Sequence, residues 1–96
     1  MYGTVARLRI KPGGEAELDR IGREHSTQIK GLVFEHVFRL DEDPQQAMLV
    51  VAFTDKAAYE ANATSPEQRE RYGQLRALMT ADPEWHDGEI ISSYPG

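Results

Sequence analysis

The stretch Leu32-Val-Phe-Glu-His-Val-Phe-Arg-Leu40, followed by Ala47-Met-Leu-Val-Val-Ala-Phe53, decides the fold of this chain. The first segment alternates as a strand does, so Leu32 and Phe34 are expected on the same face. The second is apolar at every position, which is typical of a strand covered on both faces. The polar turn Asp41–Pro44 joins them. These residues predict two neighbouring strands in a sheet whose second face is also covered.

Working outward, the hydrophobic period changes in a fixed order along the chain. It is alternating in Tyr2–Ile10, helical in Gly14–Ile29 and Ala57–Met79, and extended in Glu89–Tyr94. The second helical segment is interrupted near Asn62–Pro66, where proline follows a capping serine. The order β-α-β-β-α-β predicts an α+β, ferredoxin-like fold. We therefore expect a four-stranded antiparallel sheet with two helices on one face.

Length and composition narrow the function classes. The 96 residues predict a single domain spanning 1–96. A net charge of −5 argues against nucleic acid as a partner, because that binding depends on neutralising phosphates with Lys and Arg. The longest apolar run is too short to span a membrane. Without cysteine, and with Met1 leading directly into a strand, we expect a cytoplasmic protein without a signal peptide.

The shortness of the chain also bears on assembly. Ninety-six residues cannot easily cover both faces of a four-stranded sheet and also enclose a large pocket. The pattern therefore predicts a homodimer that closes through its sheet faces into an α/β barrel, with any pocket on the helix side of each subunit.

Cofactor motifs are missing from the sequence. No glycine-rich nucleotide-binding motif occurs, and His25, His36 and His86 lie too far apart for a recognised metal-ligand spacing. We therefore expect neither a metal nor an organic cofactor.

Three local features carry a resemblance to a known family. They are the opening strand with the turn Ile10-Lys-Pro-Gly-Gly14, the run Val51-Ala-Phe-Thr-Asp-Lys-Ala-Ala-Tyr-Glu-Ala-Asn-Ala-Thr-Ser-Pro66, and a short final strand after Asp82-Pro83. With them the chain resembles the antibiotic biosynthesis monooxygenase domain family of the dimeric α/β-barrel superfamily. The resemblance implies a cofactor-independent monooxygenase-like protein acting on a small aromatic or quinone-type substrate. A non-catalytic dimeric module that binds a small molecule or acts as a scaffold is the alternative.

The haem-degrading branch of this superfamily is a third possibility. Its chemistry looks to need an asparagine in the first strand, a tryptophan near the helix break and a histidine later in the helix. An ungapped comparison puts Arg7 or Ala6, Asn62 and Tyr72 at those places. The resemblance therefore argues against haem degradation.

Three residues are candidates for catalysis. His25 lies on the buried stripe of the first helix, where a neutral imidazole can act as a base; the alternative is a core histidine bonded to a backbone carbonyl. Asn62 and Tyr72 flank the helix break and can orient a substrate oxygen. The alternatives are that Asn62 caps the break and that Tyr72 packs with its hydroxyl at the rim.

Four further residues are candidates for substrate binding. These are Arg7, Phe34, His36 and Trp85. For Arg7, an ion pair with Glu35 on a neighbouring strand is the alternative. Packing or a dimer interface is the alternative for His36, and sealing one end of the core is the alternative for Trp85.

Overall fold

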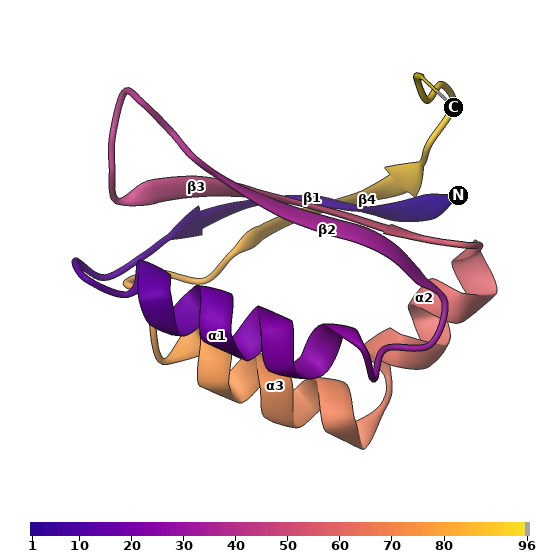
Figure 1. The fold of residues 1–96 in the computed structure, drawn as a ribbon, viewed down its shortest axis with the longest axis horizontal. Coiled ribbons are helices and arrows are strands. Elements are labelled where there is room, and N and C mark those ends of the chain that lie inside the picture. The colour runs from indigo at the N-terminus through magenta and orange to yellow at the C-terminus, as the bar shows by residue number, and fades with distance from the viewer. Residues whose placement is uncertain (96) are drawn as a thin grey trace.

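The computed structural model describes residues 1–95 as a four-stranded sheet with all helices on one side (Figure 1). The elements are β1 (Tyr2–Arg9), α1 (Glu15–Ser26), β2 (Leu32–Arg39), β3 (Gln46–Phe53), α2 (Lys56–Ala63), α3 (Pro66–Arg76) and β4 (Glu84–Glu89). The strand order is β2-β3-β1-β4 and each neighbouring pair is antiparallel. The predicted ferredoxin-like α+β fold is confirmed.

The core lies between the helices and the two central strands. Residues paired across β1 and β3 alternate between the two faces of the sheet, which puts Ala6 opposite Leu49 and Leu8 opposite Ala47 on the helix side. All four are at least nine-tenths buried, and Met79 packs against them after α3. The continuous apolar run of β3 therefore belongs to a central strand, as its composition predicts.

The second helical segment is two helices, α2 and α3, and this gives the fold three helices where two were expected. The break follows from local chemistry, because the Ser65 hydroxyl accepts from the Gln68 amide at 3.1 Å and Pro66 occupies the first turn. Asp55 caps α2 by accepting from the Ala58 amide at 2.8 Å. The interruption predicted near Asn62–Pro66 is confirmed.

The last strand lies earlier than the sequence suggests. Strand β4 is Glu84–Glu89, whereas the extended pattern had predicted Glu89–Tyr94. All six residues of β4 are exposed, so the strand is held by its backbone pairing with β1 and carries little hydrophobic signal. The apolar pair Ile90-Ile91, which drew the prediction, follows the strand in the C-terminal tail.

An irregularity at the start of β2 separates two residues expected on one face. Leu32 pairs with Phe53, Phe34 pairs with Ala52, and the register shifts between them. Consecutive residues of β3 point to opposite faces, so Leu32 turns to the helix side and Phe34 to the open side. The prediction that they share a face is wrong, because one inserted residue reverses the alternation.

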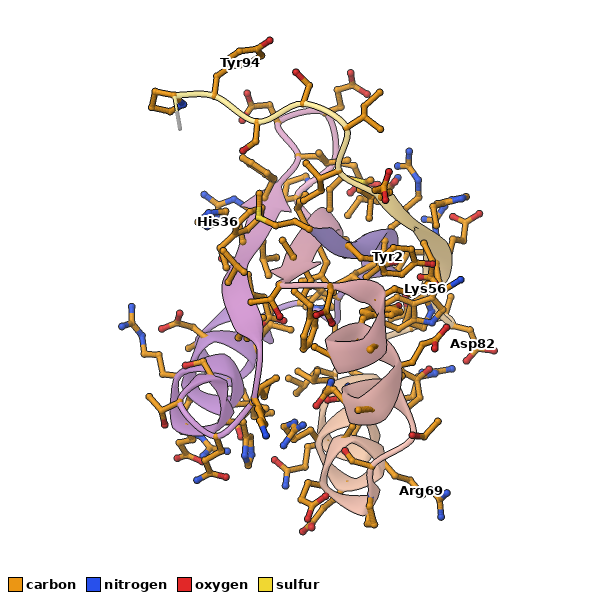
Figure 2. All side chains as sticks on the ribbon, turned by 90° about the vertical axis from the view of Figure 1, so that its right-hand side faces the viewer. Tyr2, His36, Lys56, Arg69, Asp82 and Tyr94 are labelled. Carbon is orange, nitrogen blue, oxygen red and sulfur yellow. The ribbon has the colours of Figure 1, made fainter. Side chains whose placement is uncertain are left out.

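Within residues 1–95 no helix or strand covers the side of the sheet away from the helices. Val5 and Phe38 on this open face are 40% and 57% exposed. The C-terminal tail leaves β4 toward the same side, and Tyr94 projects away from the body (Figures 1 and 2). Within residues 1–95 no helix is long and apolar enough to cross a membrane.

Candidate functional site

A cleft of about 1100 Å³ lies between the sheet and the helices. This volume slightly exceeds that of typical small-molecule sites in proteins, which are about 300–1,000 Å³. Its walls combine apolar side chains with polar and charged groups. Among these are Thr4, His25, Glu35, Tyr59, Asn62, Gln68, Arg71, Tyr72, Trp85 and Asp87.

A buried arginine is the most unusual group in the cleft. Arg71 on α3 is only 6% exposed. Its Nη2 donates to Oδ1 of Asn62 at 2.8 Å, and its Nε donates to Oε1 of Gln68 at 3.0 Å. Gln68 Oε1 also accepts from Nδ2 of Asn62 at 3.2 Å. Neutral amides therefore solvate this cation, and within residues 1–95 no carboxylate lies within 4.0 Å of it.

Glu35 is the acidic group that feels the charge of Arg71. It lies on edge strand β2, exposed as a residue, but its side chain turns to the helix side because its partner in β3 is Val51. Desolvation raises the pKa of the Glu35 carboxyl, and the charge of Arg71 opposes that rise. Glu35 does not approach Arg71 within 4.0 Å, so the two residues do not form an ion pair.

A second polar group lies where α2 meets the sheet. The Tyr59 hydroxyl donates to Oδ1 of Asp87 at 2.8 Å. Burial and the carboxylate of Asp87 together raise the pKa of Tyr59 to about 12. Thr4 is the β1 neighbour of Asp87, and its buried hydroxyl makes no hydrogen bond of good geometry within residues 1–95. It lies near enough to Tyr59 to oppose that pKa rise slightly.

Four of the predicted site residues line the cleft on the helix side or at its edge. His25 comes from α1, Asn62 from α2, Tyr72 from α3 and Trp85 from β4. The ring centroids of Tyr72 and Trp85 are 6.3 Å apart, and Trp85 remains 46% exposed at the sheet edge. The cleft thus gathers residues from four elements, although Asn62 is occupied with Arg71 and Gln68.

The other three predicted residues lie differently. The rings of Phe34 and His36 stack at 5.1 Å on the open side of β2, with Phe34 also bordering the cleft. Arg7 is on the open face too, where it donates to Oε1 of Gln46 at 2.8 Å and pairs with Glu84 at 3.7 Å. The alternative pairing of Arg7 with Glu35 is wrong, because the two side chains occupy opposite faces of the sheet.

The sequence reasoning missed Arg71, Glu35 and Tyr59. Arg71 carried a usable signal, because it lies three residues after Gln68 and four before Leu75, on the inward stripe of α3. Glu35 carried none, since alternation alone does not show which side of β2 faces the helices. Within residues 1–95 no cluster of His, Asp and Glu could hold a metal ion.

Comparison with known proteins places the chain in a family. The family model described as antibiotic biosynthesis monooxygenase matches residues 1–72. A search of curated proteins finds no match. The fold resembles an asparagine-to-alanine variant of SnoaB, a cofactor-independent oxygenase from Streptomyces nogalater, with TM-score 0.79, 19% identity, and coverage of 99% of this chain and 97% of that one.

Two other solved structures have the same fold. One is a putative antibiotic biosynthesis monooxygenase from Chloroflexus aurantiacus, with TM-score 0.77, 21% identity, and coverage of 97% and 95%. The other is a protein of the same description from Bordetella bronchiseptica, with TM-score 0.77, 18% identity, and coverage of 95% and 97%. Since the family model covers three quarters of the sequence, the chain belongs to the antibiotic biosynthesis monooxygenase family.

Proposed function

We propose that this protein is a cofactor-independent monooxygenase acting on a small aromatic phenol or quinol. The observation that carries the proposal is the cleft between sheet and helices, in which a base and hydrogen-bonding groups face an apolar wall. Membership of the family supports it, as does the shared fold with SnoaB, which is described as a cofactor-independent oxygenase.

The proposed chemistry needs a base, hydrogen-bond donors and dioxygen. The phenol O–H bond breaks, the proton passes to the imidazole of His25, and the electron pair stays on the substrate as a phenolate. Dioxygen is the oxidant: one oxygen atom replaces a ring C–H bond by C=O, so that the phenol becomes a quinone, and the other leaves as water with the two hydrogens that the substrate has lost. Tyr72 donates a hydrogen bond that orients the substrate oxygen, and Trp85 packs against the ring plane. Asn62 acts here by holding other groups of the cleft in place.

Oxygen uptake with a panel of anthrones and quinols tests this function. We expect wild-type uptake well above the uncatalysed rate, reduced about 100-fold or more in His25→Ala if the imidazole is the general base. The matched control is His86→Ala, which removes a histidine from the open side of edge strand β4. Uptake equal to the uncatalysed rate would exclude oxidation of these substrates and leave a small-molecule-binding module. A Soret shift on haem titration would instead indicate haem handling.

We also propose that the protein is a homodimer joined through the open face of the sheet. The support is a patch on this face in which Val5 and Phe38 are exposed and the half-buried Phe34 stacks on the exposed His36. Single exposed apolar residues are ordinary, but apolar residues gathered on one face of a sheet are typical of an interface. Arg7 and His36 belong to this surface in the proposal, apart from the cleft.

A further inference from the structure

Within residues 1–95 the buried charge of Arg71 has no partner of opposite charge in contact with it. Arg71 is 6% exposed, and its guanidinium donates to the amide oxygens of Asn62 and Gln68. Burying an ionised group is costly unless it is paired, and amide oxygens compensate only part of that cost. An arginine held this way in the wall of a cleft is suited to bind an anion.

The donor geometry leaves capacity for a ligand. A guanidinium carries five N–H donors in a planar fork. One from Nε and one from Nη2 are used, so Nη1 and the second N–H of Nη2 make no hydrogen bond within residues 1–95. The two amides fix the plane of the fork, because Asn62 and Gln68 are also bonded to each other at 3.2 Å. A fork fixed in this way loses little conformational entropy when it binds.

Within residues 1–95 the carboxylates of the cleft form no ion pair with Arg71. Glu35 faces Arg71 from β2 but does not approach it within 4.0 Å, and the carboxylate of Asp87 accepts a hydrogen bond from Tyr59. Apolar side chains from the helices and the sheet make up much of the remaining wall, including Leu18 and Leu75. The cleft therefore combines apolar surface with one buried cation, Arg71, since the other arginines of its lining are exposed.

We propose that the cleft selects planar aromatic molecules bearing an anionic oxygen, carboxylate or phenolate, which Arg71 binds through its free N–H donors. This inference rests on the proposed function, because it specifies the charge of the substrate. It makes Asn62 and Gln68 positioning residues that hold the guanidinium.

Binding without turnover tests it directly. The probes are 2-naphthoate and its neutral analogue 2-naphthamide, which differ mainly in charge. Their binding can be measured without any reaction, whether the protein is an oxygenase or a binding module. The readout is the fluorescence of Trp85, the sole tryptophan, which lines the cleft. We expect wild-type protein to bind the carboxylate about 10- to 100-fold more tightly than the amide, the range of a charge-assisted hydrogen bond.

Two variants separate charge from folding. Arg71→Gln removes the cation, and Arg20→Gln is its control, since Arg20 bonds to Glu17 and Glu24 on the surface of α1. Gln68→Glu is sharper. Its carboxylate can keep both hydrogen bonds that Gln68 Oε1 accepts while giving Arg71 a counter-ion, and it keeps the capping-box pattern that begins at Ser65. Its control is Gln74→Glu, an exposed position on the same helix.

The outcomes are distinct. Loss of the preference for naphthoate in Arg71→Gln and Gln68→Glu, with naphthamide affinity within about twofold of wild type, supports the proposal, and both controls should keep the preference. An unchanged preference in Gln68→Glu overturns it, as does a wild-type protein that binds neither probe or both equally. Oxygen uptake is measured separately. If the protein takes up oxygen but shows no Arg71-dependent preference for naphthoate, the anion site is excluded and the proposed function stands. If it shows the preference but takes up no oxygen, the anion site stands and the proposed function is excluded.

Discussion

The guanidinium of Arg71 donates to the side-chain oxygen of Asn62 over 2.8 Å, which joins α3 to α2 across the break between the helices. This contact occupies the amide that the sequence had suggested for substrate. The break itself, made by Ser65 and Pro66, lets the chain turn so that the two residues meet although they are nine positions apart.

Removing the Asn62 amide should destabilise the fold. Asn62→Ala leaves a buried N–H of Arg71 without its acceptor, which costs about 1–3 kcal/mol. The free energy of unfolding from urea titration measures this loss. Glu60→Ala, at an exposed position of the same helix, is the control and should change stability by less than about 0.5 kcal/mol. Equal changes in the free energy of unfolding of the two variants would mean that the contact between Arg71 and Asn62 does not stabilise the fold.

Glu35 should lower stability at neutral pH. Because its pKa is raised in the folded state, ionisation favours unfolding: the penalty is absent below the usual value near 4.5 and complete once the pH exceeds the folded pKa. Glu35→Gln should therefore raise the melting temperature at pH 7 and leave it nearly unchanged at pH 4. Glu42→Gln, in an exposed turn, is the matched control. A stabilisation of the same size at both pH values would contradict the electrostatic cause.

Tyr59 should lose its proton later than an ordinary tyrosine. Its pKa of about 12 in the folded protein lies above the usual value of 10.0, so the protonated phenol favours the folded state. This contribution to the free energy of unfolding is fully present below pH 10 and is lost as the pH rises toward 12. The absorbance of tyrosinate near 295 nm reports this, as the difference between wild type and Tyr59→Phe after a rapid pH jump. Tyr94→Phe, in the exposed tail, controls for loss of one phenol.

Replacing the carboxylate beside Tyr59 gives a further check. Asp87→Asn removes the negative charge and keeps an oxygen acceptor, so the pKa of Tyr59 should fall toward its usual value. An unchanged midpoint in this variant would assign the whole shift to burial.

A charge on the open face should separate the proposed dimer. Phe38 is 57% exposed in the single chain, and Phe38→Lys would bury an ammonium between two sheets. Light scattering should then change from about twice the chain mass to the 10.8 kDa of one chain. Ala16→Lys, at an exposed position on α1, should leave the wild-type mass. A wild-type protein with the mass of one chain at micromolar concentration would refute the dimer.

Local signals in the sequence account for most of the fold. Alternation placed β1 and β2, a continuous apolar run placed β3, and the serine–proline pair at 65 and 66 placed the helix break, because these features act within a few residues. Helical spacing of apolar residues placed His25 and Tyr72 on the inward stripes of their helices, and both residues line the cleft. The position of β4 was not predictable in this way, since its residues are exposed and its order comes from backbone pairing with β1.

The sequence by itself determined the order of elements, the capped break and the inward stripes of the helices, since each rests on short-range periodicity and capping. Only the tertiary structure decided which polar groups share the cleft. The bulge between Leu32 and Phe34 sets the face of Glu35, and the packing of α2 against α3 buries Arg71 between two amides. Burial and charge proximity depend on contacts between distant segments, so the electrostatics of the cleft arise only when the chain has folded.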